Sequence, residues 1–308
     1  MKAAMHPCEA TLAVLPEKVL AGVSGGVDSM ALLHALVATG RQPVVLHFDH
    51  QWRQESAADA AFVQAQAKKL GLKFVGGKMR RSAQGPREAA ARAARYDFFL
   101  KAARRLGLRD LIQAHHADDQ VETFLMQLLR GTGANGAGMA ANTSRGPLIV
   151  HRPWLGLWKK EIVAYARRHK IAWREDATNT DTHHRRNLVR HRVLLYLRKQ
   201  WSAHVPENLL RAAEIARAES EWLDALCGPA AQARELDVRT LRVAPVGQQR
   251  RTILRWLQAR GAGPVSFAQV ESVRGLLTKR EPAKVNLSLR QHARRRAGKI
   301  VLEGQPPA

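Results

Sequence analysis

The stretch VLAGVSGGVDSMALLHAL (residues 19–36) decides the fold class, because an apolar run and a helical pattern meet there at a glycine turn. Residues 19–23 are apolar and predict a buried strand, whereas residues 28–38 have the apolar spacing of a helix. Between them, Gly25 and Gly26 permit positive φ angles, so backbone N–H groups can close on an oxyanion. This order of strand, glycine turn and helix predicts a phosphate-binding loop.

The hexapeptide at the turn has the chemistry of such a site. It consists of Ser24, Gly25, Gly26, Val27, Asp28 and Ser29. It has neither the GxxxxGK[ST] nor the GxGxxG spacing of the common nucleotide loops. The serine hydroxyls add donors, and a carboxylate in an anion site is best interpreted as a Mg²⁺ ligand, which assigns Asp28 to the metal. The alternative is a plain turn in which Asp28 caps the helix.

Strands and helices alternate along the first two thirds of the chain. Strands are predicted at 19–23, 43–50, 73–77 and 110–116, and helices at 28–38, 55–72, 87–108 and 118–130. The alternation predicts an α/β fold with a doubly wound parallel sheet and helices on both faces. Ligands bind at the carboxyl ends of such strands. Polar residues gather there at the glycine turn, at 47–50 (with Arg53 nearby) and at His115-His116.

A change of pattern near residue 204 predicts two domains. Residues 1–204 form the first predicted domain, and residues 205–308 a smaller, mainly helical one. The second domain is expected to contain helices at 206–226, 246–260 and 267–279, and a terminal hairpin at 284–304.

The charge of the chain favours a polyanionic partner. Fifty Lys and Arg residues stand against 26 Asp and Glu, a net charge of +24, and 36 of the bases are arginines. Arginine pairs with phosphate through a planar fork of donors, so nucleic acid is the favoured partner. The alternative is a solvated basic surface.

The two cysteines, Cys8 and Cys227, are too few and too far apart for a zinc ribbon, a cysteine-ligated iron–sulfur cluster or a disulfide framework. The sequence shows neither a signal-peptide pattern nor an apolar run long enough to span a membrane. A cytoplasmic protein with no membrane partner is therefore expected.

The hexapeptide 24–29 is identified as the signature of the PP-loop ATP-pyrophosphatase superfamily. The resemblance implies that ATP is cleaved between its α and β phosphates. The substrate oxygen is adenylylated, pyrophosphate leaves, and a nucleophile then displaces AMP.

Four further segments resemble one branch of that superfamily, the tRNA(Ile)-lysidine synthetases. They are residues 47–63, 90–99, 114–139 and 173–193. The resemblance implies that L-lysine is joined to the wobble cytidine of the tRNA(Ile) with anticodon CAU, with ATP as co-substrate and Mg²⁺ as metal. It also implies that residues 1–204 are the catalytic domain and that residues 205–308 position the tRNA. It is also compatible with a homodimer. Larger members carry a further C-terminal domain, so a short form of the family is expected.

The segment HHADDQVET (115–123) supplies the expected lysine site. Asp119 and Glu122 stand three apart, on one face at the start of a helix, and can hold an ammonium group or take its proton. The resemblance implies lysine binding by His115, Asp119 and Glu122. It also implies a role for Asp119 at the metal or the nucleophile. The alternative is that Asp118 and Asp119 cap the helix; His116 is interpreted as a strand-end residue and left out.

Arginines supply the remaining candidates. Arg92 and Arg95 are three apart on a helix, and Arg95 is expected at the α-phosphate or the cytidine, so the catalytic set is Asp28, Arg95 and Asp119. The RGTG segment (130–133) is expected to place Arg130 near the substrates. The predicted RNA contacts are Arg130, Arg186, Asn187 and Arg190. Arg186 and Arg190 share a helix face at i, i+4, suited to consecutive phosphates. The alternatives are solvated basic surfaces.

The chain departs from the family pattern at Ala137, Ala177 and Tyr196, where leucine, proline and proline are usual. Two other functions compete with ligation. A tRNA thiolase of the same superfamily would rely on paired cysteines, which Cys8 and Cys227 do not provide. An RNA-binding module with a decayed nucleotide site would be expected to have lost some of Asp28, Asp119 and Glu122, all of which are present.

Overall fold

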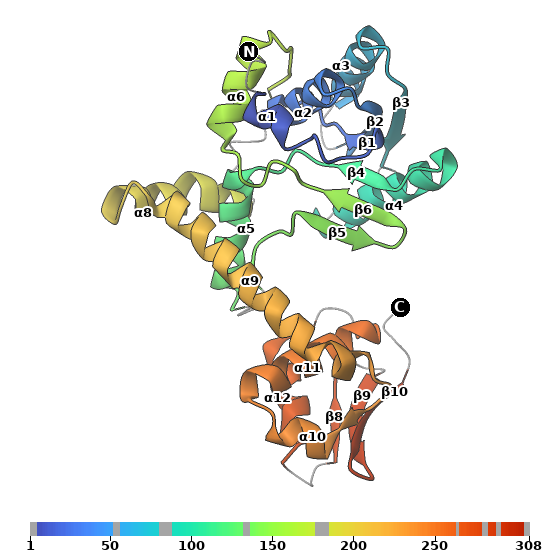
Figure 1. Ribbon diagram of the computed structural model, residues 1–308, viewed down its shortest axis with the longest axis vertical. Helices are drawn as coiled ribbons and strands as arrows, with labels where there is room; N and C mark the ends of the chain where they lie inside the picture. Colours follow the sequence, from blue (N-terminus) through green and yellow to red (C-terminus); the bar gives the residue numbers. More distant parts are fainter. Residues whose placement is uncertain are drawn as a thin grey trace. The chain divides into compact units, whose positions relative to one another are not determined.

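The computed structural model describes residues 5–51, 56–79, 88–131, 136–175, 185–262, 265–278, 283–287 and 291–304. The chain divides into two compact units (Figure 1). The first comprises Met1–Leu129 and Gly138–Ala213, and the second Arg130–Ala137 and Glu214–Ala308. The boundary predicted near residue 204 coincides with the start of helix α9 (Val205–Gln232), whereas the two units divide inside that helix.

The first unit is built on a six-stranded sheet in the order β3-β2-β1-β4-β6-β5. The strands are β1 (Lys18–Gly22), β2 (Gln42–Asp49), β3 (Phe74–Lys78), β4 (Asp110–Ile112), β5 (Asn142–Arg145) and β6 (Leu148–His151). All neighbours pair in parallel except β5, which runs antiparallel to β6 at the edge. The predicted parallel sheet is confirmed, and two strands that the sequence did not predict, the parallel β6 and the antiparallel β5, extend it beyond β4.

Ten helical segments occur within the described residues of the chain up to Gln232, the last of which, α9, continues into the second unit. They are α1 (Pro7–Ala10), α2 (Val27–Ala38), α3 (Ser56–Lys69), α4 (Glu88–Leu106), α5 (Ala117–Leu129), α6 (Lys159–Arg168), α7 (Arg185–Leu188), the π-helical turn η3 (Val189–Val193), α8 (Leu194–Gln200) and α9.

Alternation along β1 shows how helices cover both faces. Val19, Ala21 and Val23 belong to a core with α1, α2, α3 and α6, whereas Leu20 belongs to a second core with α4. Successive side chains of a strand point to opposite faces, so a strand that is apolar throughout must be covered on both sides. The doubly wound prediction is confirmed.

Strand β4 is shorter than predicted. The expected strand at 110–116 ends at Ile112, although the Gln113 backbone still donates to the His151 carbonyl at 2.9 Å. The reason lies at the next helix, because the His116 backbone N–H donates to Asp119 Oδ2 at 3.1 Å and α5 begins at Ala117. The last residues before α5 therefore serve as its N-terminal cap, which places both histidines at the carboxyl edge of the sheet.

The second unit combines helices with a four-stranded antiparallel sheet in the order β7-β10-β9-β8. Its remaining elements are β7 (Leu236–Asp237), α10 (Val238–Val243), α11 (Val246–Ala259), α12 (Phe267–Gly275), β8 (Lys284–Asn286), β9 (Gln291–Arg296) and β10 (Lys299–Gly304). The predicted hairpin at 284–304 is part of this sheet. Its core includes the fully buried Trp256, Val273 and Ile300. Across the described helices of the chain, none is long and apolar enough to cross a membrane.

Candidate active site

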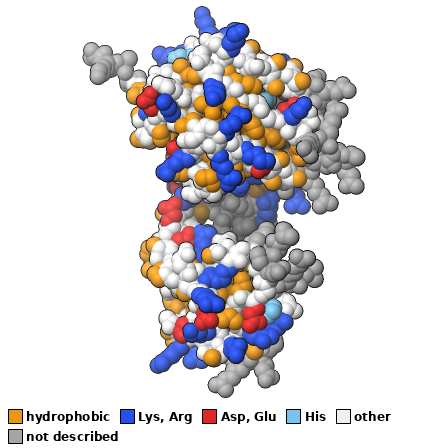
Figure 2. All heavy atoms as spheres, turned by 90° about the vertical axis from the view of Figure 1, so that its right-hand side faces the viewer, with side chains coloured by type: hydrophobic (Ala, Val, Ile, Leu, Met, Phe, Trp, Pro, Cys, Tyr) orange, Lys and Arg blue, Asp and Glu red, His pale blue; other side chains and the backbone are white. Residues whose placement is uncertain are grey.

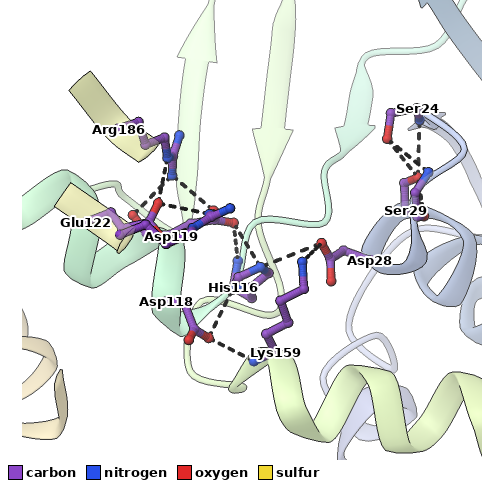
Figure 3. A network of polar contacts seen from close by, with 11 residues as sticks. Ser24, Asp28, Ser29, His116, Asp118, Asp119, Glu122, Lys159 and Arg186 are labelled. Atoms are coloured by element: carbon purple, nitrogen blue, oxygen red, sulfur yellow. Dashed lines mark hydrogen bonds and ion pairs between the residues drawn. The ribbon is translucent and has the colours of Figure 1, made fainter. Parts of the chain in front are cut away.

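Ser29 organises the backbone of the glycine turn. Its Oγ accepts hydrogen bonds from the N–H groups of Ser24 and Gly25, both at 3.2 Å, and donates to the Gly26 carbonyl at 3.0 Å. Gly26 is the N-cap of α2 and offers no side chain to its first turn. The N-terminal N–H groups of α2 are therefore left for another acceptor, as a phosphate loop requires. Figure 3 shows Ser24 and Ser29 together at this end of α2.

The two glycines of the turn predict different mutational outcomes. Gly25 has φ +100°, and a Cβ there would lie 3.3 Å from Val63 Cγ2. Gly25→Ala is therefore expected to lower the free energy of unfolding by about 1–2 kcal/mol, measured by urea denaturation. Gly26→Ala is the matched control, because Gly26 has φ −73° and its Cβ would only touch Ser24 Oγ at 3.7 Å. Equal losses in the two variants would contradict the strain at Gly25.

Asp28 lies in the first turn of α2 and faces two cationic groups. Its Oδ2 lies 3.3 Å from Lys159 Nζ and 3.7 Å from His116 Nε2. Burial alone would raise the pKa of Asp28, but the contacts with His116 and Lys159 hold that pKa below its ordinary value. Asp28 is therefore ionised at neutral pH.

The second oxygen of Asp28 is suited to a metal ligand. Asp28 Oδ1 is buried and has no hydrogen-bond partner within the described residues. A buried carboxylate oxygen without a donor is costly unless a cation binds it. In the part of the chain that the structure describes, no group of three or more His, Cys, Asp and Glu side chains could hold a metal alone. The donor set fits Mg²⁺ that brings phosphate oxygens and water as its other ligands.

His116 is the hub of the polar network, and the sequence interpretation missed it. Its buried ring, 3% exposed, places Nδ1 3.3 Å from Asp118 Oδ2 and Nε2 3.5 Å from Asp119 Oδ2, in addition to the contact with Asp28 (Figure 3). Burial opposes protonation, but the surrounding carboxylates raise the pKa of His116 to about 9. The ring is thus a cation that joins the glycine turn to α5. Its position directly before two aspartates was the signal in the sequence.

Lys159 is a second residue that sequence reasoning missed. It is the first residue of α6, and its backbone N–H donates to Asp118 Oδ2 at 2.8 Å while its ammonium faces Asp28. Asp118 is therefore used as a structural acceptor, and its pKa is held low by His116 and by the Lys159 backbone despite burial. No sequence pattern links Lys159 to Asp28, which is 131 positions away.

Arg186 and Arg190 bind the carboxylates of α5. Arg186 donates from Nε to Glu122 Oε2 at 2.7 Å and from Nη2 to Asp119 Oδ1 at 3.0 Å. Arg190 donates to both oxygens of Glu122, at 2.5 and 3.0 Å, and its Nη2 lies 3.5 Å from Asp119 Oδ1. Burial opposes the charge of Arg190, but Glu122 raises the pKa of that guanidinium. We call these four residues the arginine clasp.

The clasp brings together residues that the sequence assigned to different ligands. Arg186 and Arg190 do share a face, as their spacing predicted, and in the structure that face lies against α5. Glu122 is only 1% exposed, so the clasp neutralises a deeply buried carboxylate. Arg190 lies in η3, a π-helical turn, and such turns are frequent at functional sites.

His115 and Arg95 are half-buried beside this network, and each has one buried nitrogen that is not used. His115 Nδ1 and Arg95 Nε are buried without hydrogen-bond partners within the described residues. Burial, together with nearby arginines, lowers the pKa of His115 to about 3 even though Asp119 acts in the other direction. His115 is therefore neutral, whereas its neighbour His116 is charged.

The neutral state of His115 predicts an acid-sensitive fold. The unfolded chain binds a proton at this position near pH 6.5, and the folded protein resists it down to about pH 3. The contribution of His115 to the free energy of unfolding is therefore fully present above pH 6.5. It decreases as the pH falls toward 3, by up to about 1.4 kcal/mol per pH unit. In urea denaturation at several pH values, the free energy of unfolding of His115→Gln is expected to fall less steeply with decreasing pH than that of the wild type. His204→Gln, at an exposed histidine, should keep the original slope.

The loop that follows the RGTG segment is tied to α5. Gln120 accepts from the Met139 N–H at 2.6 Å and donates to the Met139 carbonyl at 3.0 Å. Gln127 accepts from the Gly138 N–H at 2.7 Å. Gly138 has φ +69°, and a Cβ there would lie 2.7 Å from Gln120 Oε1. The glycine thus allows the backbone to approach the helix that carries Asp119 and Glu122.

The remaining predicted residues are placed as follows. Arg130 is exposed directly after α5, and Asn187 is half-buried in α7. Ala137 is buried at 7% exposure, whereas Tyr196 is 66% exposed. Arg53, Gly133 and Ala177 lie outside the described residues.

Comparison with known proteins gives two family matches. The model of a PP-loop domain matches residues 5–197, and that of a TilS substrate binding domain matches residues 236–301. A tRNA(Ile)-lysidine synthase of Thermus thermophilus is 39% identical over 80% of this chain and 50% of its own length. One of Gloeobacter violaceus is 34% identical over 84% of this chain and 82% of its own length.

The chain spans about half the length of several curated relatives that it matches, for example 43% of a tRNA(Ile)-lysidine synthase of Exiguobacterium sibiricum. Among solved structures, a U34-tRNA thiolase of Methanococcus maripaludis aligns with a TM-score of 0.55 and 14% identity. That alignment covers 68% of this chain and 75% of the thiolase. At that identity the likeness bears on the fold alone.

Proposed function

Because the chain belongs to the tRNA(Ile)-lysidine synthase family of PP-loop proteins, we propose that it joins L-lysine to the wobble cytidine of tRNA(Ile) with anticodon CAU, at the expense of ATP. One observation of the structure supports this most directly. His116 contacts both Asp28 of the glycine turn and Asp119 of α5. The expected triphosphate site and the expected lysine site are therefore adjacent, as a two-step ligation requires.

In the first step, O2 of the cytidine attacks the α-phosphorus of ATP, and the bond from that phosphorus to the pyrophosphate oxygen breaks. The turn at 24–29 holds the triphosphate through backbone N–H groups and the positive end of α2. Lys159 and protonated His116 lie beside Asp28 and lower the cost of gathering negative charge there. Arg95 offers its buried Nε, which has no acceptor within the described residues, for the same purpose.

Mg²⁺ fits this site through Asp28 Oδ1, and when bound it would neutralise charge on the phosphates. The protein positions Asp28 by the contacts with Lys159 and His116 described above. These contacts keep the carboxylate ionised.

In the second step, the ε-amine of lysine attacks C2 of the cytidine. The C2–O bond breaks, AMP leaves with that oxygen, and the amine loses a proton. Asp119 and Glu122 are the groups proposed to bind lysine and to accept the proton. Both carboxylates bind Arg186 and Arg190 in the structure, so lysine can bind them only after the two guanidiniums have moved away.

We propose that RNA phosphates draw Arg186 and Arg190 from the clasp. A phosphate offers the bidentate acceptor geometry that a guanidinium prefers. The carboxylates would then receive the ammonium of lysine in place of the guanidiniums. This exchange makes RNA binding a precondition of lysine binding. It is compatible both with RNA binding by Arg186 and Arg190 and with lysine binding by Asp119 and Glu122.

The surface charge is consistent with an RNA substrate. Figure 2 shows Lys and Arg side chains spread over the viewed face of both units, with fewer Asp and Glu. A net charge of +24 provides the salt-dependent affinity on which RNA binding depends.

A sulfur-transfer reaction is disfavoured by the cysteines. Cys8 is fully buried, and burial raises the pKa of its thiol to about 12, so the reactive thiolate is suppressed. Cys227 is also buried, in the other unit.

The decisive experiment supplies the protein with ATP, Mg²⁺, radiolabelled lysine and an unmodified tRNA(Ile) transcript with anticodon CAU. Label is expected to enter the RNA, with one AMP and one pyrophosphate formed for each lysine incorporated. A transcript with anticodon UAU, which lacks the wobble cytidine, is the matched control. Folded protein that binds ATP and the RNA yet incorporates no lysine would refute the proposal.

A further inference from the structure

Four arginines gather around the buried ring of Tyr96. They are Arg92 and Arg95 of α4, Arg145 of β5 and Arg152, which directly follows β6. We call them the arginine cluster. The guanidinium carbon of Arg145 lies 4.1 Å from the centroid of the Tyr96 ring, and those of Arg92 and Arg95 lie 5.8 Å from it. The Tyr96 hydroxyl donates to Gln113 Oε1 at 3.2 Å, which fixes the ring as a platform.

No carboxylate of the described residues balances the cluster. Within that part of the chain, no Asp or Glu makes an ion pair with any of its four members. Arg152 is 6% exposed, and its Nη1 donates to the Ala140 carbonyl at 2.8 Å and to Thr143 Oγ1 at 3.1 Å. Its Nε, like that of Arg95, is buried without an acceptor among the same residues. The cluster therefore combines unneutralised positive charge with unused donors.

Such an arrangement favours an anionic ligand. Like charges close together oppose the folded state, and buried donors without acceptors add a further cost. Burial lowers the pKa of both Arg95 and Arg152; Tyr96 acts in the opposite direction, and the neighbouring Arg92 and Arg145 lower these pKa values further. A bound anion would relieve both costs at once.

The position of the cluster indicates which anion binds. Arg92 and Arg145 are exposed, whereas Arg152 is buried, so the cluster reaches from the surface toward the active site. At its inner end, the Tyr96 ring lies beside Gln113, to which its hydroxyl donates and which stands two residues before His115. The glycine turn at 24–29 already provides for the phosphates of a nucleotide. A second phosphate-bearing ligand that extends from the surface to the active site is expected to be a polynucleotide chain.

We propose that Arg92, Arg145 and Arg152 of the arginine cluster bind a backbone phosphate of the RNA next to the nucleotide that is modified, whereas Arg95 remains assigned to the ATP α-phosphate. The inference rests on the proposed function for the identity of the RNA. The Tyr96 ring contacts the face of the Arg145 guanidinium through its π-system, which leaves the N–H groups of that guanidinium available to a phosphate. Arg145 and Arg152 thereby become positioning residues for the target nucleotide.

The first test compares exposed arginines of equal charge. Arg92→Gln and Arg145→Gln are expected to weaken binding of an anticodon stem-loop RNA about tenfold at moderate salt. Each should reduce the slope of log affinity against log salt by about 1. Arg104→Gln and Arg105→Gln are the controls, because these arginines are exposed on the same helix α4 outside the cluster. If the control variants weaken RNA binding equally, the loss reflects only the lower net positive charge of the protein, and the proposal is overturned.

The second test identifies the phosphate. Stem-loop RNAs carrying one uncharged methylphosphonate, at either side of the target cytidine or at a distant stem position, are titrated with wild-type protein and Arg145→Gln. The loss caused by the methylphosphonate at the bound phosphate should largely disappear in Arg145→Gln, whereas the distant substitution should act equally on both proteins. Additive losses at all positions would contradict the assignment.

A third measurement separates the two sources of phosphate. ATP binding is expected to be unchanged in Arg92→Gln and Arg145→Gln. Weaker ATP binding with unchanged RNA binding would assign the cluster to the nucleotide and overturn the proposal. Because these experiments measure binding without turnover, absent lysine incorporation alongside cluster-dependent RNA binding would refute only the proposed reaction.

Discussion

Replacement of Asp28 by asparagine is expected to slow RNA-dependent pyrophosphate release by on the order of 10²–10³-fold, the usual cost of losing one preorganised electrostatic group at a reacting centre. The asparagine would keep the size of the side chain but lose the negative charge. The buried oxygen could no longer bind a divalent cation strongly, and Lys159 and His116 would lose their shared partner. The measurement is the rate of pyrophosphate release at several Mg²⁺ concentrations.

Two comparisons sharpen this result. Asp97→Asn is the matched control, because Asp97 is exposed and pairs with Lys101 at the surface, where little is gained from such a pair. Higher Mg²⁺ should recover part of the activity of Asp28→Asn if the metal is lost, and none of it if only the positions of Lys159 and His116 are disturbed. A rate close to that of the wild type would remove Asp28 from the reacting centre.

Replacement of Glu122 by glutamine is expected to affect both stability and lysine transfer. The substitution leaves Arg186 and Arg190 without their buried carboxylate, and breaking a buried ion pair costs about 3–5 kcal/mol. Both arginines are partly exposed, so a loss near the lower end, about 3 kcal/mol, is expected in urea denaturation. Lysine incorporation should fall by on the order of 10²-fold, whereas pyrophosphate release, which precedes lysine attack in the proposed mechanism, should change less than about tenfold.

A double-mutant cycle separates the two effects of Glu122→Gln. Arg190→Met removes one cation of the clasp. Because Glu122 and Arg190 contact directly, the double variant is expected to lose less free energy of unfolding than the two single variants together, by more than about 1 kcal/mol. If both activities fall in parallel with stability in every variant, Glu122 acts only in folding. Loss of lysine transfer in a variant that remains folded would support the assigned role.

The strands and helices could be predicted largely because their signals are local. The apolar run before Ser24 and the helical spacing after Asp28 depend on near neighbours, and β1 and α2 appear where they were expected. The rule that polar strand ends share one edge also brought the glycine turn and the HHADD segment together. The antiparallel β5 was not anticipated, since NTSR lacks the apolar pattern of a buried strand.

The partners of the charged groups could not be predicted in the same way. Spacing placed Arg186 and Arg190 on one helix face, but it carries no information about what lies opposite that face. The contact between Lys159 and Asp28 joins α6 to α2 and depends on the tertiary packing. His116 was passed over because a histidine after a strand is ordinarily structural, and its role depends on three carboxylates from two elements.

The contact between Gly138 and Gln120 has a consequence for variation among relatives and for redesign. A side chain at 138 would force the end of Gln120 to shift away from Met139, and with another residue at 120 the Met139 backbone would lose both of its hydrogen bonds to that side chain. The two positions are therefore expected to change only as a pair. Libraries that vary this loop should therefore change 120, 127 and 138 jointly, since independent randomisation would mostly yield combinations that lose the hydrogen bonds between the loop and α5.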